Sequence, residues 1–161
     1  YCLNLLREAR QPSKQPKLTD PMPILERVLS RFDTALSAAS FKVEVAHLSK
    51  VCLSEAQIEQ VFQNLISNVL RHASKANAPV LRISEQRDKH GAYWVIQDNG
   101  PGVPDPVKAT IFQDQHSSNG NGNGQQIGLA LLKSSLRTSK VNIEVEDAKG
   151  GGAKFIVYFN C

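Results

Sequence analysis

A helical segment at residues 54–73 carries polar side chains whose types suit a metal-bound phosphate group. Asn64, Asn68 and Arg71 fall on one edge of this helix, with His72 beside them and the apolar residues opposite. The side-chain oxygen of Asn is a hard, neutral ligand that suits Mg²⁺, and Arg pairs with phosphate oxygens. A solvated face would also be polar, although Asn is a poor helix former. The segment is therefore either a metal and phosphate site or an ordinary exposed face.

A second candidate site follows the apolar segment at residues 93–98, which ends in Asp98. Gly100 and Gly102 come next at alternate positions, and glycine permits positive φ and close approach of the backbone to a ligand. A carboxylate at the end of a strand can accept a hydrogen bond from an exocyclic amine such as adenine N6. An ordinary Asp-Asn-Gly-Pro-Gly turn explains the same residues locally.

The third candidate is a Gly/Asn-rich stretch at 113–126 that leads into a helix at 127–136. Free backbone N–H groups and the positive end of a helix together form an anion site. The stretch does not fit the G-x-x-x-x-G-K-[ST] pattern of P-loop proteins, nor a G-x-G-x-x-G turn directly after a strand. A surface loop without a ligand remains the alternative.

Helices and strands that could position these residues alternate along the chain. Apolar periodicity predicts helices at 22–39 and 54–73, the latter opened by a capping box of Ser54 and Gln57, and a short helix near 107–112. Predicted strands lie at 41–45, 80–85, 93–98, 141–146 and 153–159, the last two joined as a hairpin through 149–152. This mixture predicts an α/β fold, a two-layer sandwich of one mixed sheet with about three helices on one face.

The N-terminal residues differ from the rest in composition. Residues 1–10 resemble the last turns of a helix, and residues 11–23 contain four prolines among polar residues, as linkers do. We therefore expect residues 1–20 to be the end of a preceding helix plus a linker, and residues 21–161 to be one domain. The chain begins with Tyr1, and we expect it to be part of a longer protein.

Overall composition restricts the class of protein. The net charge is +4 without a block of Lys and Arg, which argues against nucleic-acid binding. Three widely spaced cysteines without C-x-x-C spacing argue against a disulfide framework or a zinc site and favour a reducing cytoplasm. No apolar run approaches the roughly 20 residues of a membrane span. We expect this part of the protein to be cytoplasmic, and a membrane anchor elsewhere in the parent protein would be compatible with that.

The order and spacing of the three candidate sites resemble the gyrase, chaperone, histidine kinase and MutL ATPase superfamily, whose fold is the Bergerat type. Within it, the chain is most similar to the catalytic domains of bacterial sensor histidine kinases. The resemblance rests on an N box at 61–73, a first glycine box at Asp98-Asn-Gly-Pro-Gly102, the start of an F box at Thr110-Ile-Phe112, a second glycine box at 124–131, and a closing strand segment at 151–155.

The resemblance implies ATP and Mg²⁺ as ligands and assigns a role to each matching residue. It implies that Asn68 ligates Mg²⁺, that Asp98 holds adenine N6, and that Gly100 and Gly102 shape the adenine pocket. The remaining implied ATP-binding residues lie on the phosphate side, in the lid at 113–126 and at the start of the following helix: Asn64, Arg71, His72, Gly124, Gly128 and Leu129.

One position separates the branches of the superfamily. In the branches that hydrolyse ATP, a Glu four residues before the metal-binding Asn activates water, whereas here this position is Asn64. An Asn cannot deprotonate water, which suits transfer of the phosphate to a protein side chain, with Asn64 and Arg71 at the reacting end. The resemblance thus implies a histidine kinase whose partners are a histidine-bearing dimerisation domain, a homodimeric second copy and the receiver domain of a response regulator.

Two other functions remain open at the level of sequence. Gln126 replaces a glycine of the second glycine box, Gln115 replaces the second Phe of the F box, and residues 113–126 contain no Lys or Arg. These departures allow a degenerate nucleotide-binding or interaction module without kinase turnover. An anti-sigma-type serine kinase of the same superfamily is the third possibility, although the helix and linker expected at 1–20 argue against it.

Overall fold

The computed structural model describes residues 17–112, 129, 132–134, 136 and 141–159. Its helices and strands follow in the order α1 (Met22–Ala38), β1 (Lys42–Val45), α2 (Glu55–Ala73), β2 (Val80–Asp88), β3 (Gly91–Asp98), α3 (Asp105–Lys108), β4 (Val141–Asp147) and β5 (Ala153–Phe159). Residues 1–16 lie outside the described part, so the expected helix end and most of the linker are not addressed by the structure. Thr19 nevertheless exchanges two backbone hydrogen bonds with Val51, at 2.8 and 3.0 Å, which ties the last residues before α1 to the domain.

Helix α2 begins where the sequence predicted it. The Ser54 hydroxyl accepts a hydrogen bond from the Gln57 N–H at 3.3 Å, and the Gln57 side chain accepts one from the Ser54 N–H at 2.9 Å. This reciprocal capping box satisfies two of the N–H groups that a helix start leaves unpaired. The predicted apolar stripe is buried in full and comprises Ile58, Val61, Phe62, Leu65, Ile66 and Val69.

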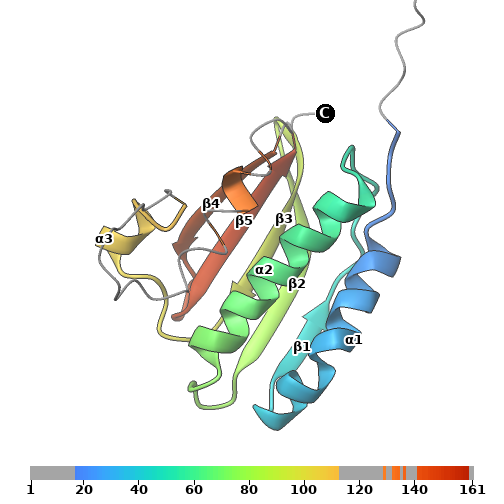
Figure 1. Cartoon of the computed structure of the whole chain (residues 1–161). Coiled ribbons are helices and arrows are strands. Elements are labelled where there is room, and N and C mark those ends of the chain that lie inside the picture. The colour runs from blue at the N-terminus through green and yellow to red at the C-terminus, as the bar shows by residue number, and fades with distance from the viewer. Residues whose placement is uncertain (1–16, 113–128, 130–131, 135, 137–140, 160–161) are drawn as a thin grey trace, which may run out of the picture.

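The five strands form one mixed sheet in the order β1-β2-β3-β5-β4, in which β1 runs parallel to β2 and all other neighbours are antiparallel. Helices α1 and α2 lie across one face of this sheet (Figure 1). Leu129, Leu132 and Leu136 are helical and belong to the same buried core. The predicted two-layer α/β sandwich and the predicted β4–β5 hairpin are therefore confirmed.

Several predicted boundaries are wrong, among them the start of β3, which is Gly91 and not residue 93. Strand β2 continues to Asp88, beyond the predicted end at residue 85, because its last residues are polar yet pair with β3 up to the tight turn before Gly91. The short helix predicted at 107–112 is found instead at Asp105–Lys108. Pro106 explains the shift, since a missing N–H costs nothing in the first turn of a helix and proline there favours an early start.

The core joins α2 to the centre of the sheet through aromatic contacts. The Trp94 ring on β3 stacks on Phe62 of α2, with ring centroids 4.9 Å apart and planes 14° apart. Phe159 meets the other side of Trp94 edge-on at 4.6 Å. Because such aromatic pairs add to the gain from burial, α2 has a defined position over β3, and this determines where its C-terminal residues lie.

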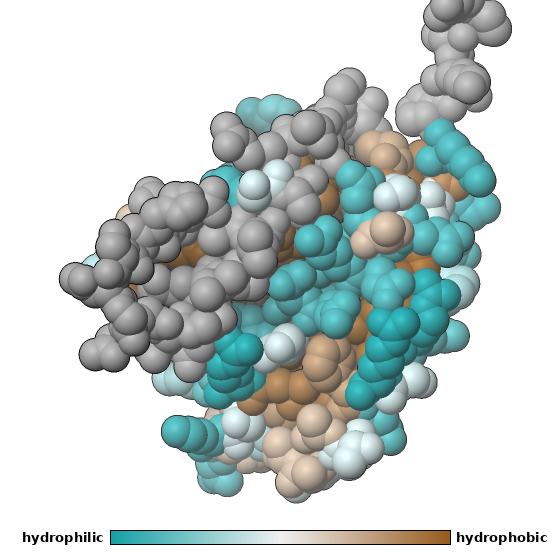
Figure 2. Space-filling model, viewed as in Figure 1, coloured by the Kyte–Doolittle hydropathy of each residue, from teal (hydrophilic) through white to brown (hydrophobic). Residues whose placement is uncertain are grey.

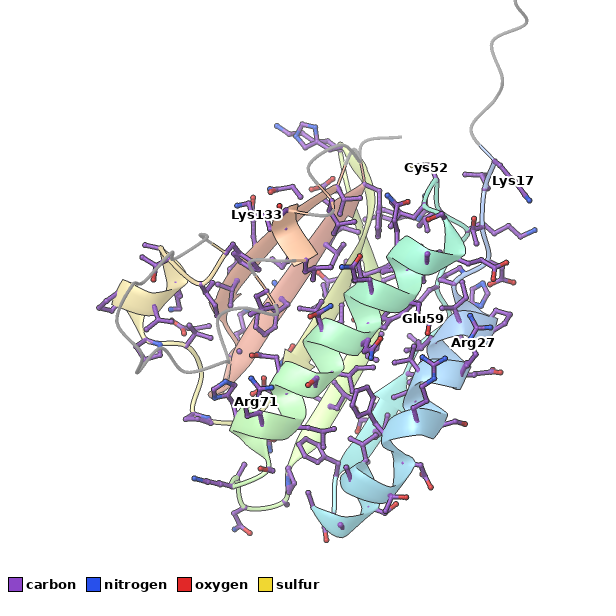
Figure 3. All side chains as sticks on the ribbon, viewed as in Figure 1. Lys17, Arg27, Cys52, Glu59, Arg71 and Lys133 are labelled. Atoms are coloured by element: carbon purple, nitrogen blue, oxygen red, sulfur yellow. The ribbon has the colours of Figure 1, made fainter. Side chains whose placement is uncertain are left out.

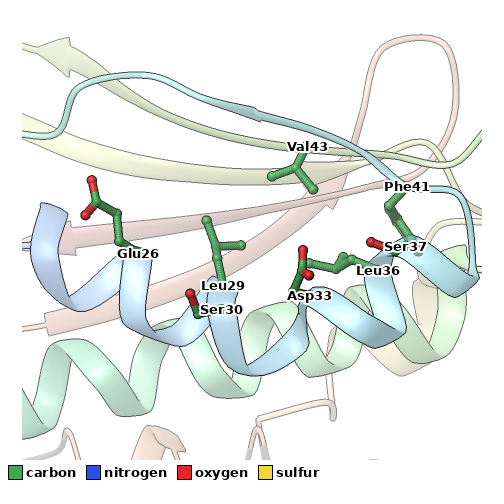
Figure 4. Close-up of a pocket in the computed structure, with 8 residues that line it drawn as sticks. All are labelled: Glu26, Leu29, Ser30, Asp33, Leu36, Ser37, Phe41 and Val43. Carbon is green, nitrogen blue, oxygen red and sulfur yellow. The ribbon is translucent and has the colours of Figure 1, made fainter.

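On the face of the molecule shown in Figure 2, the outer sides of α1 and α2 are mostly hydrophilic, and apolar surface lies between their lower ends. A groove of about 510 Å³ lies between α1 and β1 (Figure 4). It is lined by Glu26, Leu29, Ser30, Asp33, Leu36, Ser37, Phe41 and Val43. None of the residues predicted to bind a ligand lines this groove.

Two further findings concern the cysteines and the membrane. Cys52 is disulfide-bonded, which departs from the reduced state that the cysteine pattern favoured. None of the helices in the described ranges combines the length and the apolar character needed to cross a bilayer.

Candidate functional site

The polar edge of α2 is half-buried at Asn64, buried at Asn68 and exposed in the last turn of the helix. Asn64 is half-buried, and its Nδ2 donates to the Gln60 carbonyl at 2.8 Å, which leaves Oδ1 as the group available to a ligand. Asn68 is 8% exposed, and its amide forms no hydrogen bond with any described residue. Arg71 and His72 are exposed in the last turn. No described residue therefore occupies the amide of Asn68, which suits a site that a ligand completes.

Asp98 is the last residue of β3 and is 4% exposed. Its Oδ1 accepts hydrogen bonds from the N–H groups of Gly100, at 2.7 Å, and Ala153, at 3.2 Å. Burial raises the pKa of this carboxyl, while the two N–H donors and the nearby His72 act in the opposite direction. Among the described residues no donor reaches Oδ2. The two backbone donors thus orient the carboxyl and leave one oxygen to accept a hydrogen bond.

Close backbone contacts bring the end of α2 to the residues around Asp98. A Cβ placed on Gly100 would lie 2.8 Å from both Cα and Cβ of Ala73, the last residue of α2. Only glycine permits this approach without displacing the helix. His72 and Asp98 also affect each other's pKa: Asp98 raises the pKa of His72, although burial and Arg71 lower it overall. The carboxyl of Asp98 therefore adjoins the C-terminal turn of α2, where Figure 3 shows Arg71.

The structure brings these predicted residues to one region of the molecule. Asn68 precedes His72 by four residues, so both lie on the same side of α2, and Asn64 lies one turn farther from the end. Leu129 differs from the expectation for a phosphate-side residue, because its side chain is 2% exposed and belongs to the core. Only its backbone could meet a ligand. Gly124 and Gly128, like Gln115 and Gln126, lie outside the described residues.

Sequence reasoning missed the roles of Gly152 and Lys108 in this region, and it did not identify the backbone that Gly102 approaches. Gly152 has φ +100°, and a Cβ on it would lie only 2.0 Å from the Asp98 carbonyl oxygen. Gly102 has φ +77°, and a Cβ on it would lie 3.2 Å from the Gly152 carbonyl oxygen. Lys108 donates to Asp105 and Asp147, both at 2.7 Å, and so ties α3 to the end of β4. The three consecutive glycines at 150–152 were interpreted as a hairpin turn and as the start of the closing strand segment, although such a run also signals close backbone contact.

A known protein family matches the part of the sequence that builds this site. The sequence model of the "Histidine kinase-, DNA gyrase B-, and HSP90-like ATPase" family matches residues 54–161, which include α2, the Asp98 turn and the closing hairpin. The chain belongs to this ATPase family.

Curated relatives of this ATPase domain include sensor kinases. The chain is 29% identical to the phytochrome-like protein Cph1 of Synechocystis over 150 residues, covering 91% of this chain and 19% of that protein. It is 29% identical to the alginate biosynthesis sensor protein KinB of Pseudomonas aeruginosa over 159 residues, covering 94% of this chain and 26% of that protein. The chain thus spans about a fifth to a quarter of the length of these relatives.

Solved structures show the same fold as this ATPase domain. The catalytic domain of histidine kinase ThkA superposes with a TM-score of 0.71 at 18% identity, over 88% of this chain and 93% of that chain. The Acinetobacter baumannii histidine kinase AdeS superposes with a TM-score of 0.64 at 24% identity, over 88% of this chain and 64% of that chain. At these identities the comparison establishes the architecture alone.

Proposed function

We propose that this ATPase domain binds ATP together with Mg²⁺ between the polar edge of α2 and the Asp98 turn. The observation that carries the proposal is the amide of Asn68, which is 8% exposed, has no hydrogen-bond partner among the described residues, and lies on the helix whose end adjoins Asp98. An amide oxygen is a suitable hard ligand for Mg²⁺, which binds proteins through few groups and relies on phosphates and water for the rest. Mg²⁺, when bound, would neutralise charge on the phosphates.

Each end of the site has a distinct task in this proposal. The oriented carboxyl of Asp98 would accept a hydrogen bond from the exocyclic amine of adenine, with Gly100 and Gly102 leaving room for the ring. At the other end, Arg71 would bind phosphate oxygens, and it forms no ion pair with any residue of the described ranges that would compete. His72 would contribute a largely neutral imidazole, because burial and Arg71 lower its pKa.

Asn64 favours phosphate transfer over hydrolysis. Its amide nitrogen is bonded to the Gln60 carbonyl, so the group turned toward a ligand is Oδ1, which can accept a hydrogen bond or bind a metal. It cannot take a proton from water, because an amide oxygen is far too weak a base. The contribution of the domain would then be to hold the γ-phosphate in place for a nucleophile supplied by another domain.

We further propose that the chain is the catalytic domain of a sensor histidine kinase. The nucleophile would be a histidine on a dimerisation domain outside this chain, in a homodimeric parent protein, and the phosphate would pass onward to the receiver domain of a response regulator. The Asn64 position supports this assignment, as does the similarity to a relative named sensor histidine kinase TmoS, from Ectopseudomonas mendocina. The domain would act in the cytoplasm, whether or not its parent is anchored in the inner membrane.

Nucleotide binding is tested by calorimetric titration of the chain with a non-hydrolysable ATP analogue, with and without Mg²⁺. We expect Mg²⁺ to strengthen binding, Asn68→Ala to remove most of the Mg²⁺ effect, and Asp98→Ala to weaken binding under both conditions. Asn142→Ala is the matched control, because that exposed amide on β4 is hydrogen-bonded to Glu144 and to no other described residue. Unchanged affinity in both site variants would show that the nucleotide does not bind here.

Kinase activity is tested by adding labelled ATP and a separate histidine-bearing dimerisation domain. Acid-labile label on that domain is expected for a histidine kinase. Binding without any transfer would identify the alternative, an interaction module without turnover, which Gln115, Gln126 and the uncharged stretch 113–126 motivate. Acid-stable label on a serine would instead identify the serine kinase alternative.

A further inference from the structure

Asn99, the residue between Asp98 and Gly100, uses its side chain to hold a distant backbone segment. Its Oδ1 accepts a hydrogen bond from the Val80 N–H at 2.7 Å, and its Nδ2 donates to the Ala78 carbonyl at 3.0 Å. These partners precede it by 19 and 21 residues. The segment they belong to connects the end of α2 to the start of β2.

The held segment has an unfavourable backbone. Ala78 has φ +53°, in the left-handed region that residues with a Cβ avoid, and it precedes Pro79, which restricts its conformation further. The side-chain amide of Asn99 supplies the acceptor for the Val80 N–H and the donor for the Ala78 carbonyl. Asn99 therefore stabilises a conformation that the local sequence does not favour.

Asn99 is exposed, but the backbone of the turn that it shares with Gly100 approaches two other segments closely. A Cβ on Gly152, at the start of β5, would lie 2.8 Å from the Asn99 Cα, and a Cβ on Gly100 would lie 2.8 Å from the Cα of Ala73. Asn99 thus sits where three elements meet: the end of α2, the end of β3 and the start of β5. Loss of its two hydrogen bonds would release the segment that follows α2, and a shift of the turn would reach Ala73 through Gly100.

We propose that Asn99 is a positioning residue that keeps the end of α2 in register with Asp98, so that the phosphate side and the purine side of the site bind one nucleotide together. The proposal rests on the proposed function. Asn99 itself does not contact the nucleotide: both polar groups of its side chain are engaged by Val80 and Ala78.

The test compares Asn99→Ala and Asn99→Asp with the control Asn142→Ala in the full 161-residue chain. The Asp variant keeps the acceptor for Val80 and loses the donor for Ala78. Hydrogen exchange of the Val80 amide, followed by NMR without nucleotide, reports the contact directly. We expect fast exchange in Asn99→Ala, protection in Asn99→Asp, and no change in the control.

Affinity for the ATP analogue with Mg²⁺ then reports the positioning. We expect about tenfold weaker binding for Asn99→Ala, the factor that corresponds to the loss of about one well-placed contact, and a smaller loss for Asn99→Asp. In an Asn68→Ala background the further loss from Asn99→Ala should fall below about threefold, because the positioned group is already missing.

Three outcomes overturn the proposal. The first is unchanged affinity in a folded Asn99→Ala chain, and the second is the same loss in the presence and absence of Asn68, which would mark Asn99 as merely structural. The third is unaltered exchange at Val80. If Asn99→Ala does not fold, unchanged affinity in Asn99→Asp decides against it in the same way. Failure of the unsubstituted chain to bind the analogue would instead refute the proposed function, and the positioning role with it.

Discussion

Replacing Gly152 by Ala probes the contact between β5 and the Asp98 turn, and Gly151 provides a matched control. The two glycines have nearly the same backbone, with φ +100° and +103°. A Cβ on Gly151 meets nothing within 4 Å, whereas a Cβ on Gly152 would lie 2.0 Å from the Asp98 carbonyl oxygen and 2.6 Å from its carbon. The pair therefore separates the cost of an unfavourable φ from the cost of the steric contact.

The expected destabilisation has two parts. The unfavourable φ costs each variant about 1–3 kcal/mol. In Gly152→Ala the backbone must also separate from 2.0 Å to at least 3.0 Å, the shortest distance that real Cβ contacts allow. Overpacking of this kind adds about 1–3 kcal/mol, and a backbone partner cannot relax by changing rotamer. The cost of φ cancels between the two variants, so we expect Gly152→Ala to be less stable than Gly151→Ala by about 1–3 kcal/mol.

Urea denaturation of the two variants measures this difference, provided that the slope of the transition is unchanged. The shift should also disturb the hydrogen bond from the Ala153 N–H to Asp98, which is 3.2 Å long in the unsubstituted chain. Binding of the ATP analogue is therefore expected to weaken in Gly152→Ala and to persist in Gly151→Ala. Equal stabilities, within about 0.5 kcal/mol, would refute the claim that this close contact positions the Asp98 turn.

Three further predictions concern charge and capping. Asp98→Asn should stabilise the domain at pH 7, because burial disfavours the charged carboxyl. Burial raises the pKa of Asp98, so its ionisation costs stability as the pH rises, and the advantage of Asn in thermal melts should vanish toward pH 3.8. His72 should titrate below 6.5 by NMR; Arg71→Ala should raise its pKa and Asp98→Asn should lower it, and opposite shifts would contradict the assigned causes. Ser54→Ala should cost about 1 kcal/mol in urea denaturation without loss of nucleotide affinity, because it removes only the cap of α2.

Local patterns predicted most of the secondary structure. Helix α2 combines an apolar stripe at helical spacing with the Ser54 and Gln57 capping box, and both signals lie within a few residues of each other. The β4–β5 hairpin was predicted from two alternating segments around a run of glycines. The end of β2 was not predicted, because its last residues are polar and show no strand pattern of their own. They are extended because they pair with β3.

The candidate ligand residues were likewise accessible from sequence, because each belongs to a short pattern. Asn64, Asn68 and Arg71 follow helical spacing, and Asp98 ends an apolar strand before two glycines. What the patterns could not supply was the partner of each residue. The carboxyl of Asp98 is oriented by Ala153, 55 positions later, and this pairing exists only because β5 lies next to β3 in the sheet.

The sequence by itself determined the types of element, the chemical groups and the family of this protein, because periodicity, capping and motif spacing are properties of neighbouring residues. Only the tertiary structure decided the roles of Gly152 and Asn99. Gly152 is needed because the Asp98 carbonyl passes 2.0 Å from where its Cβ would be. Asn99 forms its two side-chain hydrogen bonds because the segment at Ala78 and Val80 returns beside the end of β3. Contacts between segments far apart in the chain depend on how the strands are ordered and how α2 packs across them, and no local pattern records that arrangement.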